Sequence, residues 1–149
     1  MQIAYAFANI NGAITGPNGA FSFGFGAGID DGGITAEMSD AKVVMTAGAD
    51  GKPMATLHSS KLGKIVVRVQ KTSPLNAFLS ALYNADTSSP SQIAQNTIVV
   101  TDLGGLDVIS GQSCAIEKLP NVTYGKEGPA NEWSFVVGQL DMLLGGGGV

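Results

Sequence analysis

Alternating hydrophobic and polar positions recur along the chain and predict a protein built mainly of β-strands. The clearest run covers residues 62–70, where Ile65, Val67 and Val69 share one face of a strand and the intervening side chains share the other. Shorter runs with the same character are bounded by Gly, Pro, Asn and Ser, which end strands. Further strands are therefore expected at residues 3–10, 13–15, 34–38, 97–103, 107–110, 113–119 and 132–144.

Glycine-containing turns connect several of these runs. Asp50 and Gly51 join two β-prone segments and predict a hairpin over residues 42–58. The pair Asn11-Gly12 predicts a second hairpin turn near the N-terminus. Residues 16–33 are rich in glycine around Phe21, Phe23 and Phe25, and this segment is either a long excursion or a poorly formed hairpin.

One segment has the hydrophobic period of a helix. The helix is expected to begin at Pro74, because the preceding Thr72 and Ser73 offer a hydroxyl N-cap and proline tolerates the first helical position. It is expected to end near Ala85, before a Ser- and Pro-rich turn. The spacing i, i+3, i+4 and i+7 places four side chains on one face for packing against the strands: Leu75, Phe78, Leu79 and Leu82.

Many strands and one helix predict a mainly β fold. The expected architecture is an antiparallel β-barrel or sandwich with the helix laid against it. No linker and no internal repeat divides the sequence, so residues 1–149 are expected to form one domain.

Composition indicates a chain with covered surfaces. Hydrophobic residues make up 44% of the 149 residues and charged residues only 13%, against about 25% in an average soluble domain. Mean hydropathy is +0.21, although no apolar run approaches the roughly 18 residues of a membrane helix. The first residues lack a basic region ahead of an apolar stretch, so we expect no signal peptide. We therefore expect synthesis in the cytoplasm and a homo-oligomer whose contacts hide apolar surface.

The charge balance argues against direct nucleic-acid binding. The formal net charge is −4, and Arg68 is the only arginine among eight basic residues. Proteins that grip nucleic acid use clustered Lys and Arg on the phosphates. Scattered lysines on an acidic chain predict no such cluster.

No arrangement of residues requires catalysis. The glycines at 24, 26 and 28 lack the G-x-G-x-x-G spacing and a following helix, and the sequence contains no P-loop. His58 is the only histidine, which excludes a multi-histidine zinc site within one chain, and a Ser-His-Asp set has no G-x-S-x-G elbow to support it. We expect no enzyme activity and no cofactor.

Two other reactive residue types favour structural interpretations. Asp30 and Asp31 sit among glycines and could hold a cation, but they lack the alternating spacing of a calcium loop, so an exposed acidic turn is the favoured interpretation. Cys114 is the only cysteine and stands in a strand-like run, which indicates a buried thiol. No metal site is predicted.

The segment from Lys71 to Asp86, with T-S-P-x-N-x-x-L-S-x-L-x-N-A-D, resembles the tail tube proteins of contractile-tailed bacteriophages. The C-terminal stretch from Tyr124 through Asn131-Glu132-Trp133 to the Leu-Leu-Gly-Gly ending is similar to the closing segment of the same family. The resemblance spans roughly residues 60–147. The family is also similar in fold to the hemolysin-coregulated tube protein of type VI secretion.

This resemblance implies a structural virion protein. Six copies would close a ring by continuing the sheet between subunits, and rings would stack into a hollow tube inside a contractile sheath. DNA would pass through the lumen to the host without specific binding. The implied partners are further copies of the chain, the sheath, the baseplate and the tail terminator; the implied location is the virion tail, assembled in the host cytoplasm.

The hairpin and the Gly-rich segment are the candidate contacts between subunits or rings, because both are long, carry glycine and are flanked by apolar residues. The candidate interface residues are Phe21, Phe23, Phe25, Asp30, Asp31, Met45, Asp50 and Met54. The acidic balance fits a lumen that repels phosphate. It equally fits a charge that only keeps the free subunit soluble.

Two alternatives belong to other classes. The chain could be the tube subunit of a bacterial contractile injection or secretion system, built on the same fold. It could also be a small ligand-binding β-barrel, which would favour exposed aromatic residues. Trp133 alternates with Phe135 and Val137 in an apolar strand, so we expect it in the core rather than at a binding face.

Overall fold

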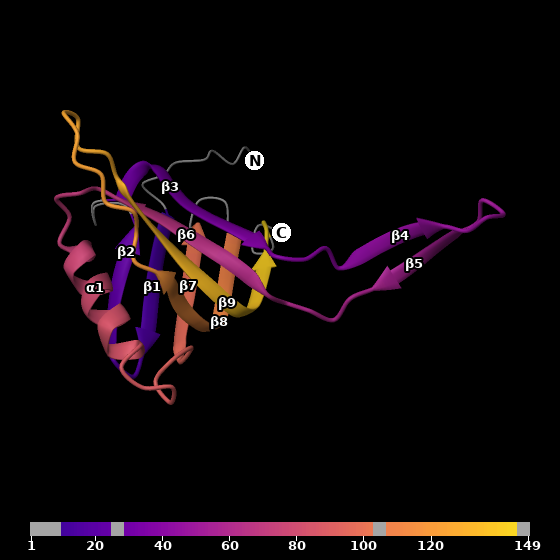
Figure 1. Ribbon diagram of the computed structural model, residues 1–149, viewed down its shortest axis with the longest axis horizontal. Coiled ribbons are helices and arrows are strands. Elements are labelled where there is room, and N and C mark those ends of the chain that lie inside the picture. Colours follow the sequence, from indigo (N-terminus) through magenta and orange to yellow (C-terminus); the bar gives the residue numbers. More distant parts are fainter. Residues whose placement is uncertain (1–9, 25–28, 103–106, 146–149) are drawn as a thin grey trace.

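The computed structural model describes residues 10–24, 29–102 and 107–145, and the side chains of residues 23–32 lie outside the description. Figure 1 shows a body of strands and one helix, with a two-stranded hairpin projecting from one end. The elements are β1 (Ile10–Gly16), β2 (Gly19–Gly24), β3 (Ile29–Met38), β4 (Val43–Ala47), β5 (Pro53–Leu57), β6 (Gly63–Val69), α1 (Leu75–Asp86), β7 (Asn96–Asp102), β8 (Asp107–Lys118) and β9 (Asn131–Leu143).

Seven of the strands form one antiparallel sheet in the order β2-β1-β7-β8-β9-β6-β3, and β4 pairs only with β5. The mainly β, antiparallel fold with one helix is confirmed. The barrel is not closed: in the described part of the chain, β2 and β3 approach one another at the two ends of the sheet but do not pair. None of the described helices has the length and apolarity needed to cross a membrane.

The turn predicted near the N-terminus needs correction. Asn11 and Gly12 do not form a turn; both lie inside β1, paired with β2 and β7. The chain reverses instead at residues 17 and 18, and Asn18 fixes this turn by donating from Nδ2 to Asp86 Oδ1 at 2.7 Å. Residues 19–24, for which we expected an excursion or a poorly formed hairpin, form β2, which pairs with β1 as a hairpin and is an edge strand of the sheet. The strand expected at residues 3–10 lies mostly outside the described residues.

The helix forms one residue later than expected, over Leu75–Asp86, with Pro74 at its N-cap position. The Ser73 hydroxyl accepts from the backbone N–H of Leu75 at 3.2 Å. Three of the four expected packing residues are buried, whereas Phe78 is 55% exposed. Its ring stacks on Phe21 of β2 with centroids 5.7 Å apart, so Phe78 joins the helix to the sheet edge rather than entering the core.

The core lies between α1 and one face of the sheet. Trp133 is 2% exposed, Cys114 is fully buried, and Ile65, Val67 and Val69 are buried as their alternation predicted. The other buried apolar residues of this cluster come from the helix and the central strands: Ile14, Leu75, Leu79, Leu82, Ile98, Val100, Ile116, Phe135, Val137 and Leu140.

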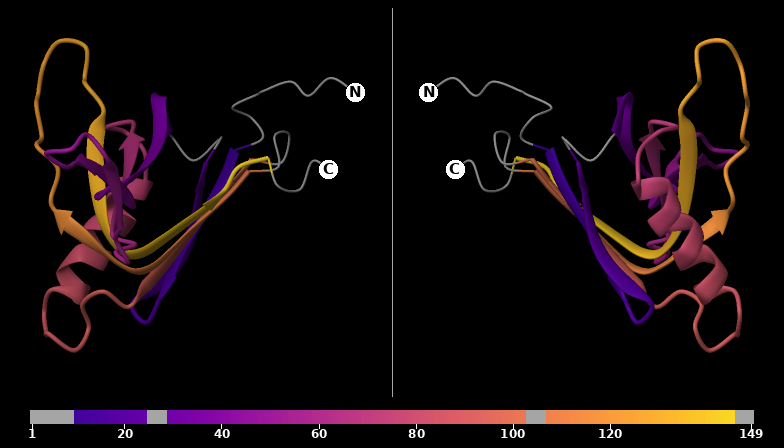
Figure 2. Two further views of the ribbon diagram at one scale, coloured as in Figure 1. Left: turned by 90° about the vertical axis from the view of Figure 1, so that its right-hand side faces the viewer. Right: turned by 90° about the vertical axis from the view of Figure 1, so that its left-hand side faces the viewer.

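A sharp bend crosses the sheet, and α1 lies outside its angle (Figure 2). In β9, Val137 and Leu140 are both buried although three residues apart, whereas strict alternation would place them on opposite faces. The change of phase occurs at Gly138, which lies opposite Ser113 of β8 in the strand register. Ser113 has a φ of 56°, so the paired strands turn together at this point.

Candidate functional site

The hairpin β4–β5 and its flanks, residues 41–59, form a projection that we call the arm. Every one of these residues is exposed, and in the described structure β4 and β5 make extensive contacts only with each other. The arm leaves the body where Ser39 N–H donates to Leu62 O at 2.9 Å, the last bond that continues the β3–β6 pairing. An isolated two-stranded hairpin is marginally stable in water. The arm therefore needs a second surface to hold it.

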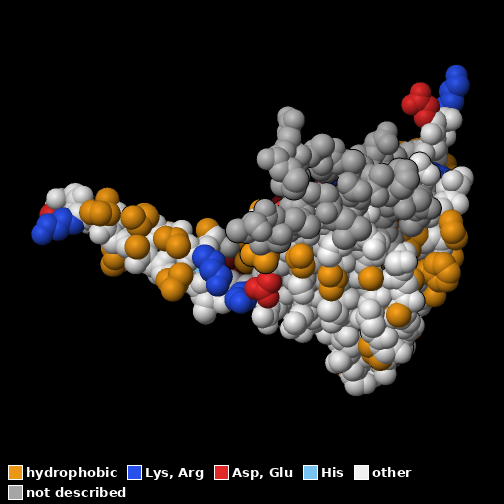
Figure 3. All heavy atoms as spheres, turned by 180° about the vertical axis from the view of Figure 1, so that it is seen from behind, with side chains coloured by type: hydrophobic (Ala, Val, Ile, Leu, Met, Phe, Trp, Pro, Cys, Tyr) orange, Lys and Arg blue, Asp and Glu red, His pale blue; other side chains and the backbone are white. Residues whose placement is uncertain are grey.

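The strand register makes one face of the arm wholly apolar. Val43 lies opposite Leu57, Met45 opposite Ala55, and Ala47 opposite Pro53, and residues directly opposite share a face. We call the six residues the apolar face. Val43 is 57% exposed, Met45 65% and Leu57 77%. Figure 3 shows hydrophobic side chains running along the arm up to its charged tip.

The other face of the arm is mixed, with Val44, Thr46, Met54 and Thr56. Met45 and Met54, both predicted as interface residues, therefore lie on opposite faces. The candidate interface residues inferred from the sequence did not include Val43 and Leu57. They can be found by stepping outward from the turn two residues at a time along each strand, once the register of the hairpin is known.

A tight turn at residues 48–52 forms the tip of the arm. The N–H of Gly51 donates to Gly48 O at 2.9 Å, and Gly51 has a φ of +81°, a conformation that favours glycine. Asp50 Oδ1 accepts from the backbone N–H of Lys52 at 3.1 Å. The tip thus presents one carboxylate and one ammonium on a small, fixed turn.

A pocket of about 300 Å³ at the root of the arm is lined by Asp40, Ala41, Val44, His58 and Ser60. Here the only serine–carboxylate contact is weak: Ser60 Oγ donates to Asp40 Oδ2 at 3.4 Å, on an exposed surface. Among the described residues, the side chain of His58 has no hydrogen bond to either. The arrangement lacks the base–nucleophile bond of a catalytic triad.

The remaining predicted interface residues fall in β2, β3 and the segment between them. Phe21 is half-buried and its ring is engaged by Phe78 of the same chain. Phe25 lies outside the described residues, and so do the side chains of Phe23, Asp30 and Asp31. Within the described chain, no three side chains of the metal-binding types come together.

The sheet face turned away from the core is mainly polar, and three of its carboxylates are ion-paired. Lys64 Nζ lies 3.3 Å from Glu117, Arg68 lies 3.9 Å from Glu132, and Lys61 lies 3.2 Å from Asp141. Lys61 also lowers the pKa of the Asp141 carboxyl through its hydrogen bond. These carboxylates therefore meet solvent as neutralised pairs rather than as an unscreened acidic surface.

Comparison with solved structures gives three similar chains. A chain of the anti-feeding prophage (AFP) baseplate structure, 6-fold symmetrised, is 13% identical, with a TM-score of 0.59 over 96% of this chain and 97% of that one. A chain of the sheath-tube complex of PVC, an extracellular contractile injection system, in its extended state is 9% identical, with a TM-score of 0.55 over 89% and 88%. A chain of the AFP tube-terminating cap is 10% identical, with a TM-score of 0.54 over 97% and 93%. At these identities the similarity establishes a common fold.

Comparison with curated proteins finds no match. The family model for the bacteriophage PhiTE tail tube protein, however, matches residues 2–145, nearly the whole sequence. The match covers the arm, the helix with its T-S-P-x-N segment and all strands of the sheet. Together with the fold, it shows that this chain belongs to the PhiTE tail tube protein family of bacteriophages.

Proposed function

We propose that this chain is a structural subunit, without catalysis or cofactor, that forms hexameric rings stacked into a hollow tail tube inside a contractile sheath. In this role it sits in the virion tail, is assembled in the host cytoplasm, and meets the sheath, the baseplate and the tail terminator. Phage DNA passes through the lumen without specific binding. The observation that carries the proposal is the exposed apolar face of the arm, which its own chain leaves uncovered.

Ring formation is supported by the two ends of the sheet. In the described structure β2 pairs only with β1, and β3 only with β6, so each has a free edge. Free edges invite pairing with another chain. Because the two edges are different surfaces, the β2 edge of one copy would pair with the β3 edge of the next. Such head-to-tail pairing closes a ring when the rotation between successive copies adds up to a full turn.

A second candidate function is the tube subunit of a bacterial contractile injection or secretion system. The similarity to the AFP and PVC chains favours it. The genes that flank this one distinguish the two: capsid and DNA-packaging genes indicate a phage, and toxin cargo genes indicate an injection device. A ligand-binding barrel is less well supported, since Trp133 is buried in the core.

Negative-stain electron microscopy of the purified protein across a concentration series tests the proposal. We expect six-fold rings or hollow tubes for the wild-type chain. Met45→Asp places a charge on the apolar face and should abolish stacking, because an unpaired charge is not tolerated in a dry contact. Thr46→Asp, one residue along on the mixed face, is the matched control and should assemble better. A monodisperse monomer at every wild-type concentration contradicts the proposal.

A further inference from the structure

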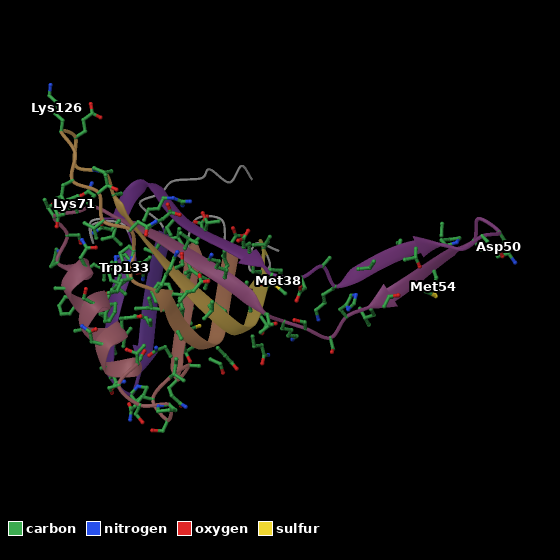
Figure 4. All side chains as sticks on the ribbon, viewed as in Figure 1. Met38, Asp50, Met54, Lys71, Lys126 and Trp133 are labelled. Atoms are coloured by element: carbon green, nitrogen blue, oxygen red, sulfur yellow. The ribbon has the colours of Figure 1, made fainter. Side chains whose placement is uncertain are left out.

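The arm has a candidate counterpart at the other end of the molecule. The loop between β8 and β9, residues 119–130, projects there, and Lys71 lies beneath it (Figure 4). In the same view Asp50 marks the tip of the arm at the far end of the long axis. Copies stacked in one orientation would bring the arm tip of one copy toward the Lys71 end of the next.

Lys71 is a cation without an ordinary counter-group. Its Nζ is buried and has no hydrogen-bond partner in the described part of the chain. It lies 4.5 Å from the ring centroid of Tyr124. The ring face attracts the ammonium through a cation–π contact, but it offers no lone pair that could accept a hydrogen bond from the ammonium. Burying an ammonium without acceptors is unfavourable. The site therefore favours an arriving carboxylate or carbonyl oxygen.

Tyr124 can yield to such an arrival. Its side chain is 86% exposed, so little besides Lys71 holds it in place. The same loop exposes Leu119 at 47% and Val122 at 51%. These side chains supply apolar surface on the loop that carries Tyr124, which suits the apolar face of an incoming hairpin.

The pocket beside Lys71 carries both signs of charge. Its volume is about 340 Å³, and it is lined by Gln70, Lys71, Thr72, Glu127, Gly128 and Ala130. Ligand pockets run from about 300 to 1,000 Å³, so this one admits a tight turn rather than a whole strand. The arm tip is a tight turn that carries Asp50 and Lys52. Asp50 is opposite in charge to Lys71, and Lys52 is opposite in charge to Glu127.

We propose that the arm tip of one copy docks in this pocket of a second copy, with Asp50 directed to Lys71 and Lys52 to Glu127. The inference rests on the proposed function and adds to it the receiving site. The two surfaces are different and lie at opposite ends of the chain, so the contact is head-to-tail. Repetition of such a contact extends a stack instead of closing a dimer.

A double variant, Lys52→Cys with Glu127→Cys, tests the contact by oxidation of assembled protein and non-reducing electrophoresis. Each copy then carries both halves of the contact, so we expect a ladder of disulfide-linked multimers. Each single variant should give no ladder, which also excludes a contribution from the buried Cys114. Lys52→Cys with Asn84→Cys, which moves the second thiol to an exposed site on α1, is the matched control and should give no ladder.

A double-mutant cycle on the critical concentration for assembly tests the charge pair. Asp50→Asn and Lys71→Met should each raise that concentration at least about fivefold, and the double variant no more than either single one, because both remove the same contact. Asp50→Asn combined with Lys42→Met, at the root of the arm, should give independent effects.

The outcomes separate the two proposals. Normal tubes without a 52–127 ladder, or with residue 52 linked elsewhere, overturn the docking site and leave the proposed function standing. Strictly multiplicative effects of Asp50→Asn and Lys71→Met also overturn the charge pairing. A wild-type chain that forms no rings or tubes contradicts both proposals.

Discussion

Asn76 joins the start of the helix to the sheet, and its removal should destabilise the fold strongly. Its Nδ2 donates to the backbone oxygens of residues 70, 71 and 73 at 2.9 to 3.3 Å. Its Oδ1 accepts from Asn131 Nδ2 at 3.1 Å and from Trp133 Nε1 at 3.0 Å. Asn131 and Trp133 are 8% and 2% exposed, so water cannot readily replace the lost acceptor.

The magnitude of the Asn76→Ala change follows from these partners. A buried donor left without an acceptor costs about 1–3 kcal/mol, and two such donors are stranded here. The three backbone oxygens lie nearer the surface and add less. We expect a loss of about 2–4 kcal/mol in the free energy of unfolding, which for a chain of this size lowers Tm by about 5–15 °C.

Urea unfolding followed by far-ultraviolet circular dichroism measures the effect. All variants should carry Met45→Asp to remove stacking and should be compared at one low protein concentration, because any remaining assembly would raise the apparent stability by mass action. Asn84→Ala, an exposed asparagine on the same helix, is the matched control and should change stability by less than about 0.5 kcal/mol. In a Trp133→Phe background the Asn76→Ala loss should shrink by about 1 kcal/mol, since one stranded donor is absent. A loss no larger than that of Asn84→Ala would refute the reasoning.

Three further changes probe the fold at independent places. Gly138→Ala should lower the free energy of unfolding in urea by about 1–2 kcal/mol, because the new Cβ would lie 2.9 Å from Ser113 Cβ. Gly125→Ala is the control: its new Cβ meets open space, so stability should not change. Burial raises the pKa of the Cys114 thiol from 9.0 to about 11, so alkylation of this thiol at pH 8 should require unfolding. The protonated thiol should contribute its full stabilisation below pH 9, and this contribution should be lost as the pH rises toward 11. Rapid alkylation of folded protein would contradict this. Asp86→Ala should lower the free energy of unfolding by about 1–3 kcal/mol, because the buried Asn96 amide donates a hydrogen bond to Asp86 at 2.7 Å and would lose its acceptor. An unchanged urea midpoint would contradict that account.

Local periodicity sufficed for most strands and for the helix. The alternation of Ile65, Val67 and Val69 set the buried face of β6, and the i, i+3, i+4 spacing placed Leu75, Leu79 and Leu82 in the core. These patterns succeed because each element buries one face against the same core, so the sequence of each element alone records which face that is.

Features that depend on distant partners were not predictable in this way. Asn11-Gly12 has the composition of a hairpin turn, yet pairing on both sides holds it within β1. The T-S-P-x-N segment was recognised as a motif, but the five bonds of Asn76 include partners 55 and 57 residues away. The arm's exposure also has no local signal, because its apolar residues look like those of any buried strand.

The phase change at Gly138 and Ser113 has a consequence for how this tube protein can vary. Because β8 and β9 turn together where Ser113 and Gly138 meet, each strand serves two differently oriented halves of the sheet. In the ring that we propose, small substitutions at this hinge line would change the curvature that each subunit contributes. The bore diameter of the proposed tube would then change while the hydrophobic interior stays intact.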